Sequence, residues 1–317
     1  MKIALSYRVD SYPVGDTTLS AKQLGRLVSV PVETYCQSVS RAFNKLGHET
    51  TNVYGLNTKW RPQDFDLYIE LDNGRDGKGQ LGFGQQLNRS DIQLDIPTAV
   101  WFIDSHGQPD LHKALSVHYD HVFFAVWDKR ELFAGHSSAH WCPNATDPEF
   151  FFPKVVGEPE FDFGFFGSKT GLERSDPMVE ICKKRGWAYD VRQVGGGSGK
   201  HKWPRTSDAM NNCRTLFNHG QKHDGPNLRV VESMAVGRPL ITDSDPRSGM
   251  DRLFTPGEHY LGYTAYSYLG LEEKMEFAMA HQGWCHSMAM TAQKLVLEKH
   301  LVKHRAAQMI EVFNATV

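Results

Sequence analysis

Two acids, Asp224 and Glu232, stand with seven residues between them in the most informative stretch of the chain, which runs on through a Gly-x-Pro turn to Asp243. Asn227 is expected to open a helix whose free backbone N–H groups and positive end would accept a diphosphate. Arg229 would add a fixed cation, and Glu232, one turn along, would accept the hydroxyls of a ribose, as carboxylates do in dinucleotide-binding folds. The alternative is an ordinary helix ion pair between Arg229 and Glu232, contributing roughly a few tenths of a kcal/mol.

A third acid, Asp104, directly follows the apolar run of residues 100–103. In a parallel sheet this position is the carboxyl edge, where a base would reach the proton of an acceptor hydroxyl. One such carboxylate is enough to transfer a sugar from a diphosphate with inversion at the anomeric carbon, if arginines and helix N–H groups neutralise the departing diphosphate. The alternative for Asp104 is a helix N-cap or a turn residue. His106 is another candidate base, although with 15 histidines in the chain a surface or packing role is the commoner one.

Two segments interleave cations with an aromatic residue, namely residues 59–61 and residues 199–205, the second of which contains Lys202 and Trp203. This mixture suits contact with nucleic-acid phosphates and stacking on a base. The Gly-rich residues 75–89 are expected to form an acceptor loop. The alternative for each segment is a solvated surface loop.

Other familiar motifs are incomplete or absent in this sequence. Residues 194–201 imitate a phosphate-binding P-loop, but Val194 and His201 stand where that motif requires Gly and Ser or Thr. Asp243 and Asp245 imitate an acid pair that would hold a divalent ion on a diphosphate, yet their place after the Gly-x-Pro turn fits a turn better. No G-x-G-x-x-G follows the first strand, which argues against a nicotinamide or flavin enzyme, and the histidines show no metal-ligand spacing. We therefore predict no metal site.

The elements that must position these residues follow an α/β pattern. Residues 1–6 predict a buried strand, and apolar side chains at helical spacing over residues 32–46, closed by Gly47, predict a helix. Three further short apolar runs, each followed by polar or Gly/Pro residues, predict parallel strands buried on both faces: residues 66–71, 98–103 and 121–126. We therefore predict a doubly wound domain over residues 1–153.

The two prolines of residues 153–160 interrupt both periodicities and predict a linker. Beyond it the pattern restarts with a strand, a loop, a helix and a later strand, over residues 161–166, 167–171, 176–185 and 239–242. Residues 271–313 are rich in helix formers and predict two or more closing helices. The predicted fold is thus α/β, with a second Rossmann-like domain over residues 161–317 that faces the first across a cleft.

Composition bounds the class of protein. The chain has 317 residues, with 35 Lys+Arg against 37 Asp+Glu, and this balance argues against a histone-like coat on nucleic acid. Its five cysteines are far apart and include no C-x-x-C, which predicts neither a disulfide framework nor a zinc ribbon. No apolar run is long enough to cross a bilayer, and no signal peptide is evident. We expect a protein of the cytoplasm, or of the host cytoplasm if a phage encodes it, without a membrane partner.

The stretch from Asp224 to Asp243 resembles the donor-binding signature of two-Rossmann (GT-B) glycosyltransferases, including the group of CgeB-like proteins. Residues 141–153, 161–168, 253–260 and 300–313 are similar to that group as well, so the resemblance covers roughly the last two thirds of the chain. Asp224 departs from it, because related families often carry Glu there. The resemblance implies that the second domain binds a nucleotide sugar.

A second, scattered resemblance is to phage DNA β-glucosyltransferases. It rests on residues 1–4, 33–34, 102–104, 167–168, 202–204 and 229–235, together with Arg174. It implies that Asp104 is the general base and that Arg174 binds the donor phosphates. Lys169 and Thr170 depart from it, because the phage enzyme has a further arginine in this loop.

Together these arguments predict a glycosyltransferase that moves a sugar from a UDP-sugar, with UDP-glucose expected, to a hydroxyl of a 5-hydroxymethylated pyrimidine in DNA. The predicted catalytic residue is Asp104. The predicted nucleotide-sugar site consists of Gly167, Ser168, Arg174, Asp224, Asn227, Leu228, Arg229 and Glu232, and the predicted acceptor site consists of Glu33, His106, Lys202 and Trp203.

Several alternatives stay open at this point. The acceptor could instead be a protein, a glycan or a small molecule, and the same architecture serves nucleotide-sugar epimerases and non-catalytic binding proteins. The acid pair Asp224 and Glu232 resembles retaining enzymes whereas Asp104 resembles an inverting one, so the stereochemical outcome is open. No tightly bound cofactor is expected; the UDP-sugar is a co-substrate, and a divalent cation could stimulate transfer.

Overall fold

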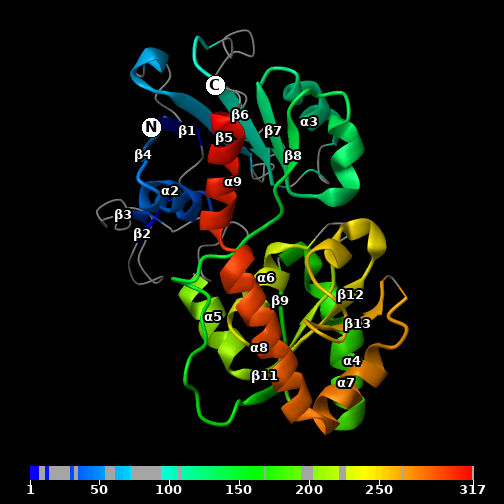
Figure 1. The fold of residues 1–317 in the computed structure, drawn as a ribbon. Helices are drawn as coiled ribbons and strands as arrows, with labels where there is room; N and C mark the ends of the chain where they lie inside the picture. The colour runs from blue at the N-terminus through cyan, green and yellow to red at the C-terminus, as the bar shows by residue number, and fades with distance from the viewer. Residues whose placement is uncertain are drawn as a thin grey trace.

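The computed structural model describes residues 1–6, 11–13, 29–31, 35–53, 61–72, 94–103, 105, 109–167, 169–193, 203–220, 226–265 and 267–315. Their strands form two separate parallel sheets, one in each half of the chain, and a small antiparallel pair made by β2 (Ser11–Pro13) and β3 (Ser29–Pro31). Figure 1 shows the two sheets in two bodies, one above the other, each with helices packed around it. The predicted α/β fold with two Rossmann-like domains is confirmed.

The first sheet has the strand order β4-β1-β5-β6-β7-β8, and every neighbouring pair is parallel. Its strands are β1 (Lys2–Ser6), β4 (Glu49–Asn52), β5 (Leu67–Asp72), β6 (Thr98–Phe102), β7 (His121–Phe124) and β8 (Ala139–Trp141). The helical segments of this half are α2 (Tyr35–Lys45), α3 (Pro109–Ser116), η2 (Pro62–Asp64) and η4 (Trp127–Phe133). The strands predicted over residues 1–6, 66–71, 98–103 and 121–126 are all present within a few residues.

Both faces of this sheet are covered, as continuous apolar strands require. Ile69 and Trp101 point into a core that includes Cys36 and Phe43 of α2. Alternate residues of the same strands, among them Tyr68, Val100 and Phe102, point into an opposite core with Leu115 of α3 and Phe133 of η4. Because successive side chains of a strand alternate between faces, the chain must supply helical cover on both sides.

The second sheet has the order β10-β9-β11-β12-β13 and is also parallel throughout. Its strands are β9 (Phe161–Gly167), β10 (Tyr189–Gln193), β11 (Cys213–Asn218), β12 (Leu240–Ser244) and β13 (Leu261–Thr264). Its helical segments are η5 (Lys169–Ser175), α4 (Asp176–Arg185), α5 (Trp203–Asn211), α6 (Leu228–Ala235), η6 (Pro246–Ser248), η7 (Met250–Arg252), α7 (Leu271–Ala280) and α8 (Gln282–Lys299). Side chains of α5, α6 and α8 share one core and those of α4 and α7 share the other, so this sheet is doubly wound too.

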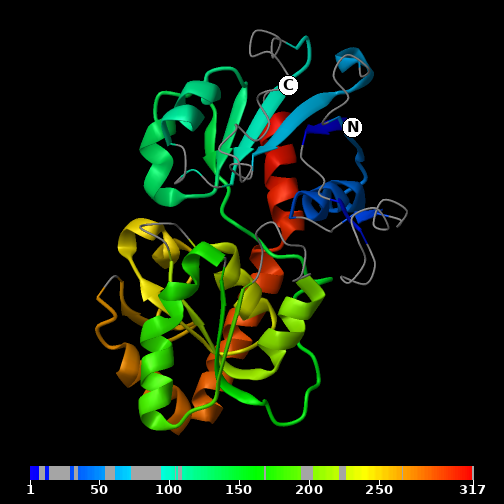
Figure 2. The same cartoon turned by 180° about the vertical axis from the view of Figure 1, so that it is seen from behind.

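The last helix, α9 (Val302–Asn314), crosses back to the first half. Its buried residues Val302, Ala306, Met309 and Phe313 join the core of the first sheet beside α2. Figures 1 and 2, which show the molecule from opposite sides, both place α9 alongside the first sheet. We expected the closing helices to belong with the second half, and α9 departs from that expectation because its apolar face covers the first sheet. The predicted boundary between residues 153 and 161 stays a prediction.

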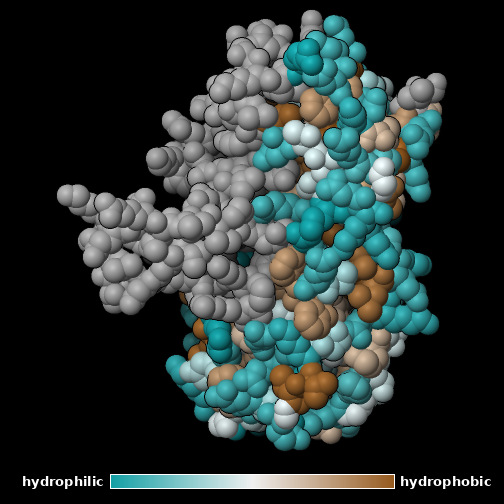
Figure 3. All heavy atoms as spheres, turned by 90° about the vertical axis from the view of Figure 1, so that its left-hand side faces the viewer, coloured by the Kyte–Doolittle hydropathy of each residue, from teal (hydrophilic) through white to brown (hydrophobic). Residues whose placement is uncertain are grey.

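Two observations concern the surface. On the face shown in Figure 3, the hydrophobic residues of the described part form separate patches among hydrophilic ones. Within the residues that the structure describes, no helix has both the length and the apolar character needed to cross a membrane.

Candidate active site

The start of helix α6 lies where the two halves meet. Asn227 is the N-cap, and its side chain accepts a hydrogen bond from the backbone N–H of Val230 at 3.3 Å. Leu228, the first residue of the helix, packs against the core of the first sheet. From the first half, the side-chain amide of Asn144 donates to the carbonyl of Pro226 at 3.3 Å. The N-terminal end of α6, where free backbone N–H groups attract anions, is therefore held at the junction.

Arg229 and Glu232 form an ion pair on the first turns of α6. The ion pair that we considered as the plainer alternative is thus present, but it is not a surface pair. Glu232 is 3% exposed and Arg229 is 20% exposed. Burial raises the pKa of Glu232 to about 7, against the opposing effect of Arg229. A carboxylate buried at this cost would gain from further hydrogen-bond donors, which the hydroxyls of a sugar would supply.

Polar side chains gather at the carboxyl ends of β11 and β12, next to this helix. The amide of Asn218 donates to the Thr242 hydroxyl at 3.0 Å, and Asn227 donates to the Asn218 side-chain oxygen at 3.3 Å. The backbone N–H of Gly220 donates to Asp243 Oδ1 at 2.8 Å. These residues line one shallow pocket together with Ser248 of η6 and Met250 of η7. The pocket therefore brings the strand ends and the start of α6 to one place.

Arg174 reaches this edge from the helical segment that follows the neighbouring strand, β9. It lies in η5, which follows β9 and its last residue Gly167, and its Nη1 donates to the carbonyl of His219 at 2.8 Å. His219 is buried, and its Nδ1 lies 2.7 Å from the hydroxyl of Tyr263 on β13. Tyr263 in turn donates to the carbonyl of Asn218 at 3.2 Å. Three strands thus hold the Arg174 side chain in place at the same edge.

The structure places the predicted residues as follows. Gly167, Arg174, Asn227, Leu228, Arg229 and Glu232 all lie at the carboxyl edge of the second sheet or on the helix that starts there. Asp104, Ser168, Asp224, Glu33, His106 and Lys202 lie outside the described residues. Trp203 is the first residue of α5, and its side chain is not among those described.

Sequence reasoning missed the supporting residues Asn218, His219, Thr242 and Tyr263. A signal for Asn218 and Thr242 was available, because both are polar residues at the end of an apolar run. The contact of His219 with Tyr263, which stands 44 residues further along, has no signal in the local sequence.

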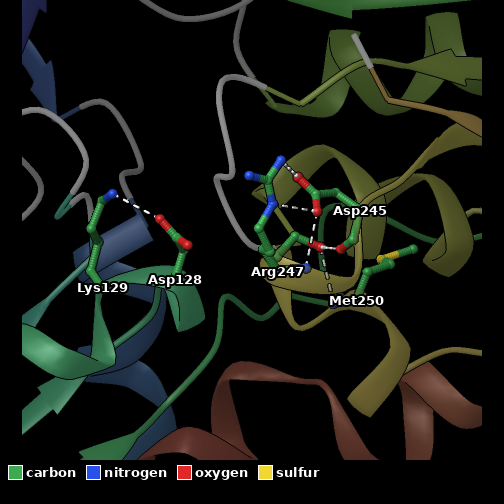
Figure 4. A network of polar contacts seen from close by, with 6 residues as sticks. Asp128, Lys129, Asp245, Arg247 and Met250 are labelled. Carbon is green, nitrogen blue, oxygen red and sulfur yellow. Dashed lines mark hydrogen bonds and ion pairs between the residues drawn. The ribbon is translucent and has the colours of Figure 1, made fainter. Parts of the chain in front are cut away.

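The acids Asp243 and Asp245 have structural partners, and of the two Asp245 lies at the predicted turn while Asp243 lies within β12. Asp245 caps η6: its Oδ1 accepts from the backbone N–H of Arg247 at 3.0 Å and from Arg247 Nε at 3.1 Å, and its Oδ2 accepts from Arg247 Nη2 at 3.2 Å (Figure 4). Asp243 holds the N–H of Gly220. Over the described ranges, no three His, Cys, Asp or Glu side chains lie together in a way that could hold a metal ion.

A second contact between the halves lies beside this pocket. Trp127 of η4 is so close to Gly249 that a Cβ added to that glycine would lie 2.7 Å from the Trp127 Cβ. The guanidinium of Arg252 stacks over the Trp127 ring at 4.1 Å, and that of Arg130 at 4.9 Å. In Figure 4 the ion pair of Asp128 and Lys129 lies on one side of this junction and that of Asp245 and Arg247 on the other.

The comparisons with known proteins agree with this geometry. The model of a family described as glycosyl transferase-like matches residues 148–311. A comparison with curated proteins finds no match. Among solved structures, sucrose-phosphate synthase from Thermosynechococcus elongatus is 12% identical with a TM-score of 0.63, and the alignment covers 99% of this chain and 98% of that one.

Two further structures were solved with nucleotides. HepE of Anabaena in complex with UDP-glucose is 10% identical with a TM-score of 0.62, over 99% of this chain and 100% of that one. An α-glucosyltransferase in complex with UDP and a 13-mer DNA containing an HMU base is 10% identical with a TM-score of 0.65, over 99% of both chains. These likenesses extend over both domains and show the two-Rossmann, GT-B fold.

The family model spans more than half of the 317 residues and includes every described residue of the predicted nucleotide-sugar site. The protein therefore belongs to the glycosyl transferase-like family and is a glycosyltransferase of the GT-B architecture.

Proposed function

We propose that this enzyme takes its sugar from a UDP-sugar bound at the start of α6. The observation that carries the proposal is the buried carboxylate of Glu232, held beside Arg229 one turn into a helix that begins at the carboxyl edge of the sheet. HepE was solved with UDP-glucose, and the α-glucosyltransferase was solved with UDP. UDP-glucose is accordingly the first donor to test.

In this proposal the diphosphate lies at the N-terminal end of α6, where backbone N–H groups and Arg229 face it. Arg174 adds positive charge from η5, and the loop of Gly167 and Ser168 comes close to the phosphates. Glu232 accepts the two ribose hydroxyls, and Asp224 contacts the sugar. Since the departing diphosphate gains negative charge as the bond to the sugar breaks, these cations stabilise the transition state without a general acid.

Asp104 is the proposed base on the acceptor side. It takes the proton from the acceptor hydroxyl while that oxygen forms a bond to the anomeric carbon. The bond from the anomeric carbon to the diphosphate breaks, and UDP leaves with the electron pair. The support for this role is the sequence order, because Asp104 follows the buried strand β6, which ends at Phe102.

For the acceptor we propose a 5-hydroxymethylated pyrimidine in DNA. The support is the full-length likeness to an α-glucosyltransferase solved with DNA that contains an HMU base. The predicted acceptor residues Glu33, His106, Lys202 and Trp203, and the cation-aromatic segments at residues 59–61 and 199–205, would contact the phosphates and bases of that DNA. The proposed setting is the cytoplasm, or the host cytoplasm if a phage encodes the protein.

The test is mass spectrometry of nucleosides after incubation with UDP-glucose, or a panel of UDP-sugars, and DNA containing cytosine, hydroxymethylcytosine or hydroxymethyluracil. We expect a hexose mass gain on a hydroxymethylated base alone, and a smaller gain in the same time from the Glu232→Gln variant at a low concentration of UDP-glucose. A gain on unmodified DNA would contradict the acceptor. Slow UDP release without any gain would redirect the acceptor to proteins, glycans or small molecules, and a changed free donor would indicate an epimerase. Repeating the reaction with EDTA tests whether a divalent cation stimulates transfer.

A further inference from the structure

A cavity of about 390 Å³ lies at the amino edge of the second sheet, at the opposite end of α6 from the proposed donor site. Its walls come from the start of β11, the turn of Gly237 to Pro239 that follows α6, the end of α7 and the first turn of α8. Figure 1 shows α7 and the start of α8 at the end of this domain that is far from the first sheet. Five or six residues of strand, or about 15–20 Å, separate the two edges. The size is that of pockets that hold small ligands.

Two guanidinium groups belong to this cavity, Arg214 and Arg238. Arg214 is balanced, because it pairs with Glu158 at 2.9 Å and with Asp162 at 3.3 Å. Arg238 is not balanced in this way. Over the part of the chain that the structure describes, its hydrogen bond is from Nη2 to the carbonyl of Asn211 at 2.6 Å, and no carboxylate pairs with it.

Arg238 has hydrogen-bond donors left for an anion. Arg238 is half-buried, and both its burial and the neighbouring Arg214 lower its pKa. A guanidinium carries five N–H donors, and the bond to Asn211 uses one of them. The carbonyl of Asn211 is at the negative end of α5, which favours a cation there, but this contact supplies no anionic partner for Arg238. The groups best suited to a guanidinium are carboxylate and phosphate, which accept two parallel hydrogen bonds.

The apolar residues of the cavity walls indicate the uncharged part of the ligand. Pro159, Pro239 and Met279 give the cavity apolar surfaces beside the cations. His286 of α8 also lines it. A ligand that fits has an anionic group at one end and a compact organic body at the other.

We propose that this cavity binds a phosphorylated small molecule, with the phosphate on Arg238, at a site separate from the donor site. The proposal does not rest on the identity of the donor or of the acceptor. The ligand would be either a free sugar phosphate or a second molecule of the nucleotide product, which share the phosphate group.

Gly283 offers a precise variant. It lines the cavity in the first turn of α8, and a Cβ added there meets nothing within 4 Å. Gly283→Asp would place a negative charge at the cavity without a steric clash, and an acid in the first turn of a helix does not weaken that helix. Gly283→Ala is the matched control, because it adds the Cβ without the charge.

The experiment is calorimetric titration with glucose 6-phosphate, inorganic phosphate and UDP at constant ionic strength. The Arg229→Ala protein serves as the background, so that anion binding at the start of α6 is weakened. We expect this protein to bind at least one phosphorylated probe, and Arg238→Gln and Gly283→Asp to weaken that binding by about tenfold or more. Gly283→Ala should leave it unchanged. A preference for glucose 6-phosphate or for UDP then distinguishes the two sources.

Equal binding by all four proteins, or no binding of any probe by the Arg229→Ala protein, would overturn the proposal. Circular dichroism and the melting temperature without ligand verify that each variant is folded, and the two independent variants must agree. Failure of the proposed donor site has a different signature, since Arg229→Ala would then bind UDP as tightly as the wild type does.

Discussion

The two halves of the chain share a fold but differ in what their sheets carry. The family model begins at residue 148, after the last strand of the first sheet, and ends within α9. The carboxyl edge of the second sheet holds a hydrogen-bonded set of polar side chains, among them Asn218, His219, Thr242 and Asp243. Both faces of the first sheet are largely apolar, and three of the predicted acceptor residues, Glu33, His106 and Lys202, lie outside the described part. The family pattern thus coincides with the polar carboxyl edge of the second sheet, which is the half that we propose to bind the donor.

Two buried carboxylates, one in each half, also differ in what surrounds them. Glu70 on β5 accepts two hydrogen bonds at its Oε2, from the hydroxyls of Tyr68 at 3.2 Å and Tyr119 at 2.5 Å, inside the first domain. Glu232 on α6 faces a cation at the edge of the second. Burial of a carboxylate therefore marks a binding site only where the neighbouring groups leave a place for a ligand. The predictions below test this division between the halves.

The largest effect is expected from Asp104→Asn, which removes the proposed base from the acceptor half. Turnover should fall by about 10²–10⁴-fold. The affinity for UDP should stay at the wild-type value, because the donor half is untouched. Steady-state transfer assays and calorimetry measure the two quantities, with His106→Asn as the neighbouring control. Turnover at the wild-type rate would remove Asp104 from the mechanism and make His106 the next candidate.

Glu232→Gln should weaken UDP binding by about 10–100-fold, because a neutral amide replaces the acceptor of two ribose hydroxyls. Glu70→Gln is the matched control, since it makes the same substitution at the buried carboxylate of the first domain. It should lower the free energy of unfolding by about 1–2 kcal/mol and leave UDP binding unchanged. Equal losses of UDP affinity in both variants would contradict the assignment of Glu232 to binding and of Glu70 to structure.

Gly249→Ala tests the contact between the halves. Gly249 has a φ of +77°, and an added Cβ would lie 2.7 Å from that of Trp127. We expect a loss of about 2 kcal/mol in the free energy of unfolding and a slower transfer, because Trp127 and the first half would have to shift. Gly257→Ala has a similar φ of +81° but open space around the new Cβ, so it isolates the backbone cost. Thermal unfolding of the two variants measures the difference in their stability. Equal melting temperatures would show that Trp127 moves aside at no measurable cost.

The smallest effect concerns pH. With the pKa of Glu232 raised to about 7, the carboxylate that accepts ribose hydroxyls is formed as the pH rises from 6 to 8. The affinity for UDP should therefore increase over this range, by up to about tenfold, and Glu232→Gln should remove that part of the pH dependence. Because the native carboxyl holds its proton to a higher pH than the unfolded one, its contribution to the free energy of unfolding falls as the pH rises from about 4.5 to about 7. An affinity that decreases with pH in the wild type alone would contradict this assignment.

Much of the fold was predictable because its signals are local. The apolar runs of β1, β6, β9 and β12, and the glycine and prolines that end the segments around them, stand in the sequence within a few residues of the observed bounds. The start of α6 was predictable in the same way, because Asn227 is a residue type that caps a helix through its own side chain. The donor role of the residues on that helix, inferred from one short stretch, stays a prediction.

What the tertiary structure alone decided involves partners far apart in the chain. Periodicity shows that α9 has an apolar face, but not that this face covers the first sheet beside α2. The bond from Arg174 to His219 spans 45 residues, and the contact of Trp127 with Gly249 joins the two halves. A side-chain pattern specifies which surface of an element must be buried, whereas the partner that buries it is set by strand order and by the packing of the whole chain.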